Sequence, residues 1–142
     1  MQNQILSVEN LSVDIPLSEG VLQAVDNIDL HVDRGETLCI VGESGCGKSL
    51  TSLALMDLLP KKAIRTIKKL DLNQVSILEY SEKQMSDIRG NKIGMIFQEP
   101  MTSLNPAFKI GNQMVETLRR HRNITKSEAI NRAKQMLEKV GI

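Results

Sequence analysis

The residues best suited to chemistry lie in one short stretch, IVGESGCGKS, at positions 40–49. Its glycines, lysine and serine occupy the fixed places of the pattern Gly-x-x-x-x-Gly-Lys-Ser, which forms a loop around nucleoside triphosphates. In such a loop, backbone N–H groups and a helix N-terminus bind the phosphate oxygens. The predicted phosphate-binding residues are Gly42, Glu43, Ser44, Gly45, Cys46, Gly47, Lys48, Ser49 and Leu50.

Three members of this set have distinct predicted roles. The ammonium of Lys48 is predicted to bind the β- and γ-phosphates of ATP, and the hydroxyl of Ser49 is predicted to ligate Mg²⁺. Cys46 has two interpretations: a thiol made reactive by the helix N-terminus, or a small residue that fits the loop.

The motif needs a strand before it and a helix after it. The apolar run at residues 37–41 predicts a buried parallel strand, and residues 49–59 predict a helix that Pro60 stops. This context favours a phosphate loop over an accidental glycine turn.

The composition narrows the class of protein. A chain of 142 residues with 41% hydrophobic and 25% charged residues suits one globular domain or part of one. The net charge of +1 gives no reason to expect a nucleic-acid partner. Two cysteines outside any Cys-x-x-Cys pair argue against a disulfide scaffold or a zinc site. With no signal sequence and no apolar run long enough to span a bilayer, we expect a cytosolic protein.

The remaining pattern alternates strands and helices. Residues 61–69 are basic, and we interpret them as a solvated face. Methionines 114 and 136 are predicted core residues. Strands are predicted at 5–15, 24–32, 75–78 and 92–98, and helices at 113–121 and after the capping boxes at 81–84 and 125–128.

The predicted strand at 92–98 leads into a second motif. Hydrolysis of ATP usually requires a carboxylate after an apolar strand, so Glu99 taken alone is a candidate base. The longer stretch GMIFQEPMTSLNP, residues 94–106, resembles the glutamine loop of ABC-transporter ATPases. Its QEPMTSLNP wording resembles the branch that imports oligopeptides, dipeptides and nickel. Residues 24–28 and 42–49 also fit, so the resemblance covers essentially the whole chain.

The resemblance implies a function and partners. Gln98 would be a catalytic residue with Lys48, contacting Mg²⁺ and the attacking water, while Glu99 becomes a loop residue. Residues 99–108 would face a membrane permease. The expected protein is a peripheral ATP-binding subunit on the cytoplasmic face of the membrane. It would drive peptide or nickel uptake with two permease subunits, a second ATPase subunit and, indirectly, an extracytoplasmic solute-binding protein.

The chain also departs from the resemblance. Many such ATPases stack adenine on an aromatic residue, but the corresponding position is Ile15, and no Phe, Tyr or Trp occurs from there to Val21. The Leu-Ser-Gly-Gly-Gln-type signature, the apolar strand ending in Asp-Glu and the switch histidine do not occur in residues 1–142. We therefore expect the chain to hold nucleotide with the first half of a site, without turnover, and to expose apolar sheet surface.

The predicted fold is α/β: a P-loop NTPase core, an N-terminal antiparallel β lobe and the start of a helical subdomain. The lobe would cover residues 1–36, the core 37–100 and the helical part 101–142. Two other hypotheses stay open. One is a free-standing P-loop kinase or GTPase, and the other is a short product that binds nucleotide or permease without catalysis.

Overall fold

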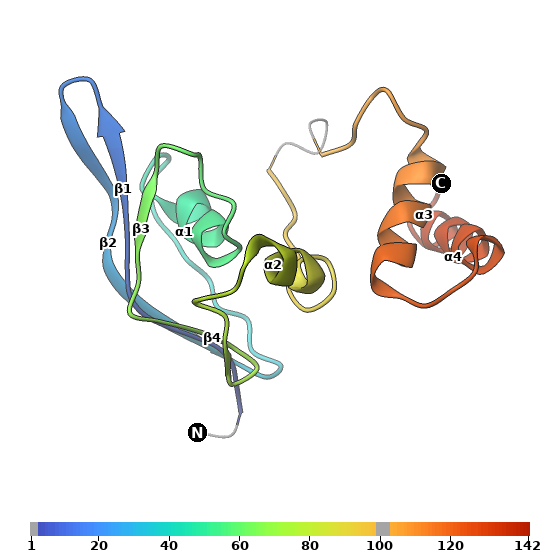
Figure 1. Ribbon diagram of the computed structural model, residues 1–142, viewed down its shortest axis with the longest axis horizontal. Helices are drawn as coiled ribbons and strands as arrows, with labels where there is room; N and C mark the ends of the chain where they lie inside the picture. The colour runs from blue at the N-terminus through green and yellow to red at the C-terminus, as the bar shows by residue number, and fades with distance from the viewer. Residues whose placement is uncertain (1–2, 99–102) are drawn as a thin grey trace. The chain divides into compact units, whose positions relative to one another are not determined.

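The computed structural model describes residues 3–98 and 103–142 (Figure 1). They form two compact units, Met1–Ser86 and Asp87–Ile142. The prediction for Glu99 lies outside the described residues, as do four of the positions expected to face a permease, 99–102.

A long antiparallel hairpin opens the first unit. Strand β1 (Gln4–Leu17) pairs with β2 (Gly20–Asp33), and the turn lies at Ser18 and Glu19. Both strands and the turn were predicted, although the strands are longer than expected. His31 is exposed, as the alternation of β2 predicted. That alternation places residues 28, 30 and 32 inward and residues 27, 29 and 31 in solvent.

Three short strands complete the sheet. These are β3 (Ile64–Thr66), β4 (Lys69–Leu72) and β5 (Val75–Ser76), which lies within the short strand predicted at 75–78. The order is β2-β1-β4-β5, and β3 also pairs with β1. Residues 61–69, which we interpreted as a solvated face, include β3 and the first residue of β4, and none of them is buried. The charged residues of this segment hid the alternation typical of a strand. In the structure, Arg65, Lys68 and Lys69 form ion pairs within this unit.

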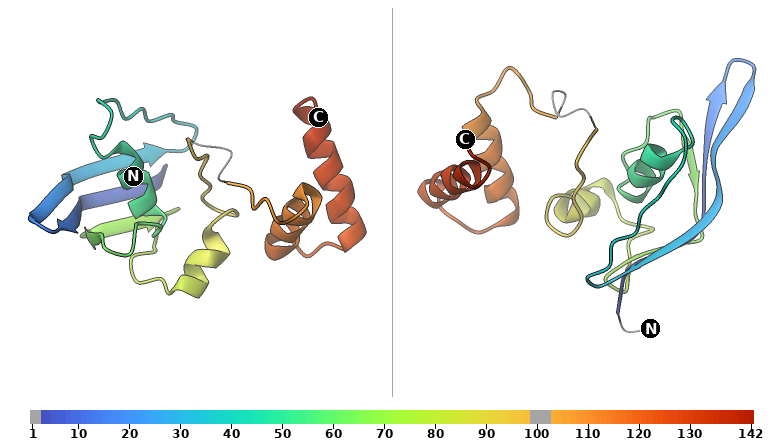
Figure 2. Two further views of the ribbon diagram at one scale, coloured as in Figure 1. Left: turned by 90° about the horizontal axis from the view of Figure 1, so that it is seen from above. Right: turned by 180° about the vertical axis from the view of Figure 1, so that it is seen from behind.

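Helix α1 (Lys48–Leu55) follows the phosphate loop and contacts β1 and β2. Both views in Figure 2 show it against one face of the sheet. Helix α1 ends four residues before Leu59, the predicted last residue, because Asp57 adopts a positive φ of 54° and the N–H of Leu58 donates to the carbonyl of Leu53. The buried apolar side chains of this unit are Val8, Leu11, Val13, Val25, Ala54, Met56, Leu70, Ile77 and Met85.

The strand predicted at residues 37–41 is absent. These residues are irregular and exposed, and Val41 is 88% exposed. A parallel strand needs hydrogen-bonded neighbours and cover on both faces, and no strand among the described residues pairs with this segment. Its apolar side chains therefore lie on the surface, although not as part of a sheet.

The strand predicted at residues 92–98 is absent for the same reason. One isolated bridge joins Ile93 to Arg89, and the rest of the segment is irregular. Ile96 is 99% exposed and Phe97 45% exposed. The prediction of a strand here was wrong, because a strand forms only where a partner supplies its hydrogen bonds.

Three helices complete the described chain. They are α2 (Glu82–Ile88), α3 (Ile110–His121) and α4 (Lys126–Lys139), and α3 packs on α4. Both predicted capping boxes form, at Ser81 with Gln84 and at Thr125 with Glu128. Ala129 and Ala133 are buried in the second unit. Met136 is 49% exposed, so its prediction as a core residue was wrong.

A cluster of charges on β1 and its neighbours predicts a pH dependence of stability. The carboxylate of Glu9 accepts hydrogen bonds from Lys69 and Lys68. These bonds lower the pKa of Glu9 from its ordinary value, and the bond from Lys69 has the larger effect. The stabilisation is complete above the unfolded-state pKa of about 4.3 and is lost as the pH falls through the lower folded-state pKa. We expect Glu9→Gln to lower the free energy of unfolding at pH 7 and to have little effect below that pKa.

Urea denaturation of the wild type and the variant at several pH values measures this difference. Glu19→Gln in the exposed turn is the matched control, because Glu19 has no ion pair among the described residues. A loss for Glu9→Gln that stays constant down to pH 2 contradicts the assignment.

Candidate phosphate-binding loop

The loop at residues 42–49 is shaped by its glycines. Gly45 and Gly47 have φ values of 85° and 88°, in the region that disfavours side chains. The N–H of Cys46 donates to the carbonyl of Glu43 at 3.4 Å, which closes a turn. A Cβ at Gly42 would lie 2.5 Å from the Cys46 sulfur, so a side chain there would require the Cys46 side chain to move.

Gly47 connects the loop to the hairpin below it. It is buried, and a Cβ at this position would lie 2.3 Å from the carbonyl oxygen of Ala24 and 3.2 Å from Val25. The loop therefore rests directly on β2. The sequence indicated the glycine but not the strand residues that support it.

Lys48 is the first residue of α1, and its side chain turns back over the loop. Its Nζ donates to the carbonyl of Gly42 at 2.8 Å and to that of Glu43 at 2.6 Å. It also lies 3.3 Å from the sulfur of Cys46. The ammonium is thus held where the loop curves around it. The two carbonyl oxygens accept hydrogen bonds that phosphate oxygens could accept in their place.

The N-terminus of α1 is open for an anion. Its first turn contains no acidic residue, and Gly47 before it provides no side-chain cap. The first N–H groups of a helix have no acceptor within the helix, and the helix dipole favours negative charge there. Thr51 is buried and its hydroxyl donates to the carbonyl of Gly47 at 3.1 Å, which fixes the loop to the helix.

The remaining predicted loop residues differ in exposure. Glu43, Ser44, Cys46 and Ser49 are exposed, whereas Leu50 is half-buried. Lys48 and Ser49 are the first two residues of α1. The ammonium of Lys48 and the hydroxyl of Ser49, the predicted Mg²⁺ ligand, therefore come from the same helix turn. Cys39 and Cys46 are both free thiols. Among the residues described, no group of three or more His, Cys, Asp or Glu side chains forms a metal cluster.

Gln98 does not belong to the same compact unit as Lys48 and Ser49. It lies exposed in the second unit, whereas Lys48 and Ser49 lie in the first. Its role as a Mg²⁺ ligand stays a prediction. The position of Ile15 near adenine also stays a prediction. Ile15 is half-buried and pairs with Leu22 across the hairpin.

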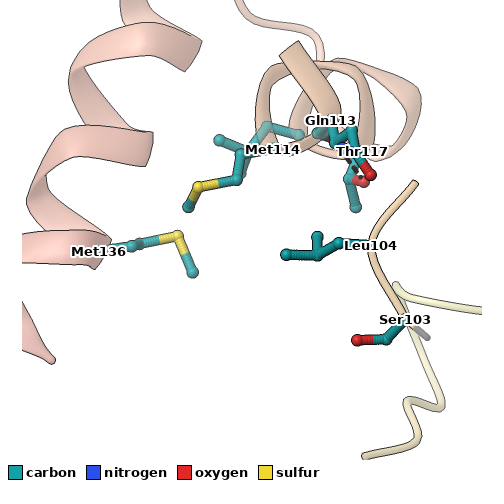
Figure 3. A pocket seen from close by; sticks show the side chains of 7 residues that line it. Ser103, Leu104, Gln113, Met114, Thr117 and Met136 are labelled. Carbon is teal, nitrogen blue, oxygen red and sulfur yellow. Dashed lines mark hydrogen bonds between the residues drawn. The ribbon is translucent and has the colours of Figure 1, made fainter. Parts of the chain in front are cut away.

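Sequence analysis missed an apolar groove in the second unit. A groove of about 300 Å³ is lined by side chains from α3, α4 and the segment before α3, as Figure 3 shows. The signal for it was the pair of methionines at one turn of each helix, which we assigned to the core. The lining residues are Ser103, Leu104, Gln113, Met114, Thr117, Leu118 and Met136.

The loop, its lysine and the helix that follows place the chain in the class of P-loop nucleotide-binding proteins. More specifically, the chain belongs to the ABC transporter family, whose sequence profile matches residues 25–142. Domains of this family bind ATP. The described residues include no helix long and apolar enough to cross a membrane.

Three relatives show the similarity. The oligopeptide transport ATP-binding protein OppD of Bacillus subtilis (strain 168) is 45% identical over 98% of this chain. A probable peptide ABC transporter ATP-binding protein, y4tR, of Sinorhizobium fredii (strain NBRC 101917 / NGR234) is 42% identical over 97%. The glutathione import ATP-binding protein GsiA of Escherichia coli O157:H7 is 43% identical over 97%. The chain spans 39%, 42% and 23% of these proteins respectively.

Proposed function

We propose that the protein is the ATP-binding subunit of an ABC importer that couples ATP hydrolysis to the uptake of peptides. The observation that carries this proposal is the Lys48 ammonium, held over the loop at the uncapped N-terminus of α1. Two relatives named for peptide transport, and one named for import of the tripeptide glutathione, support the class of solute. Nickel remains the alternative solute.

The residues of the chain would divide the work. Residues 42–50 would bind the phosphates of ATP, with Lys48 on the β- and γ-phosphates. The geometry fits a phosphate, because the Lys48 donors are presently paired only with loop atoms that a stronger, charged acceptor can replace. Ser49 and Gln98 would hold Mg²⁺, which neutralises phosphate charge when bound.

Residues 99–108 would face the permease. The described part of this segment, 103–108, is exposed, and Leu104 lines the apolar groove of Figure 3 with Met114 and Met136. An exposed apolar groove suits a partner protein better than water. The subunit would thus work on the cytoplasmic face of the membrane with two permease subunits and a second ATPase subunit, and indirectly with a solute-binding protein.

A nucleotide panel tests the proposal. We expect Mg-ATP to bind and AMP to bind at least about 100-fold more weakly, because AMP lacks the phosphates that Lys48 neutralises. ATP and GTP should differ by less than about tenfold, since no aromatic side chain lies at or near Ile15. Isothermal titration calorimetry measures these affinities.

Ile15→Tyr is the variant that probes the base pocket. It should tighten ATP binding if the hairpin faces adenine, and an unchanged dissociation constant means that another residue packs the base. A preference for GTP of several orders of magnitude would instead support a free-standing GTPase.

A further inference from the structure

One side chain fastens the segment before α3 to the helix. The N–H of Asn105 donates to Oε1 of Gln113 at 3.0 Å. In return, Nε2 of Gln113 donates to the carbonyl of Asn105 at 2.9 Å and to that of Phe108 at 3.0 Å. The amide of Gln113 therefore satisfies three backbone groups of one short turn, on both its donor and its acceptor side.

The turn itself adds two further bonds. The side chain of Asn105 accepts from the N–H of Ala107 at 2.9 Å, and the carbonyl of Asn105 accepts from the N–H of Phe108 at 3.2 Å. Asn105 is thus bonded through its N–H, its carbonyl and its side chain. Because Gln113 lies in the first turns of α3, it transfers the rigidity of a helix to a segment that has no regular structure of its own.

The fastened turn sets the width of the apolar groove. Leu104 directly precedes Asn105 and forms one wall, while Met114 and Met136 form the wall on the helices (Figure 3). If Asn105 moves away from α3, Leu104 moves with it, because the two residues are adjacent in the chain.

We infer that Gln113 is a positioning residue, which holds residues 105–108 and the groove in the shape that receives the permease. This inference rests on the proposed function, since it concerns the segment expected to face the permease. A residue that merely stabilised α3 would use its hydrogen bonds within the helix, whereas Gln113 directs all three side-chain bonds to the preceding segment.

Hydrogen exchange tests the clamp itself. In Gln113→Ala, the amide of Asn105 should exchange about tenfold faster, because it loses its acceptor. In Gln113→Glu the acceptor remains, but the second carboxylate oxygen would face the carbonyls of Asn105 and Phe108 and repel them. That amide should therefore exchange faster than in the wild type but less than in Gln113→Ala. The amides of α4 should not change in either variant. Gln135→Ala is the matched control, because it removes an exposed glutamine side chain from α4.

Coupling tests the role of the clamp. The test uses the full-length subunit, because residues 1–142 alone are not expected to turn ATP over. The readout is the ratio of its ATPase activity with the permease in proteoliposomes to its activity without the permease. This ratio should fall about tenfold in both Gln113→Ala and Gln113→Glu, because each variant leaves the carbonyls of Asn105 and Phe108 without their donor. A merely structural defect would lower both activities together and leave the ratio unchanged.

The outcomes separate the two proposals. Unchanged exchange of the Asn105 amide in Gln113→Ala overturns the clamp. Faster exchange with an unchanged ratio overturns the positioning role alone. If the wild-type subunit is not stimulated by the permease at all, the proposed function fails and the positioning role fails with it. Faster exchange together with a lowered ratio supports both.

Discussion

Replacing Lys48 by alanine should weaken Mg-ATP binding roughly 100-fold or more, the largest effect on affinity that we expect from a single substitution. The phosphates carry several negative charges, and charge-assisted hydrogen bonds are about twice as strong as neutral ones. Loss of about 3 kcal/mol corresponds to a factor of about 100 in the dissociation constant. Isothermal titration calorimetry of the wild type and the variant measures the difference.

Two controls make the Lys48 experiment specific. Lys61→Ala removes an exposed lysine outside the loop and should leave the affinity within about twofold, since exposed charges at a distance are largely screened. The Lys48 side chain also donates to the carbonyls of Gly42 and Glu43, so its removal could disturb the loop. Thermal denaturation of Lys48→Ala therefore checks that the variant is folded. Equal affinity in a folded Lys48→Ala variant rules out the phosphate loop as the nucleotide site.

Gly47→Ala should be the most destabilising substitution in the loop. The residue has a φ of 88°, where an L side chain costs about 1–2 kcal/mol. In addition, the new Cβ would lie 2.3 Å from the carbonyl oxygen of Ala24, so either the loop or β2 must move. We expect a total loss of about 3 kcal/mol or more in the free energy of unfolding, together with a clear loss of Mg-ATP affinity. Urea denaturation measures the stability change.

Gly45→Ala is the matched comparison. Gly45 has a similar φ of 85°, but nothing lies within 4 Å of its Cβ position. This variant should therefore show the strain alone, about 1–2 kcal/mol. If the two variants are equally stable, the loop does not rest on Ala24 as described.

Local signals predicted the elements that stabilise themselves within the described chain. The alternation in residues 24–32, the turn at Ser18 and the capping boxes at Ser81 and Thr125 all depend on near neighbours, and all were confirmed. The strands predicted at 37–41 and 92–98 were wrong, because a buried parallel strand depends on distant partners that no local pattern reveals. Strands β3 and β4 were missed because charged residues within them masked a short alternation.

The candidate site divides in the same way. The glycines, Lys48 and Ser49 could be placed from their order alone, since the motif prescribes a strand-side loop and a helix start. The support of Gly47 by Ala24 could not, because that contact joins two segments whose sequences carry no sign of each other. The clamp by Gln113 was also missed, because a glutamine on a predicted helix normally indicates a solvated position.

The central claim is that residues 1–142 hold Mg-ATP through the loop but do not turn it over. Phosphoryl transfer needs charge neutralisation, a positioned water and stabilisation of the developing charge. By our proposal, Lys48 and Ser49 would serve the first need and Gln98 part of the second. The signature motif, whose amides would serve the third, does not occur in these residues.

Phosphate release by the purified chain, under conditions where calorimetry shows Mg-ATP bound, tests this claim most directly. The account predicts release no faster than that of Lys48→Ala, which serves as the control for contaminating ATPases. Release that depends on Lys48 and is lost in Glu99→Gln would contradict it, and would make Glu99 the base of a different kind of P-loop enzyme.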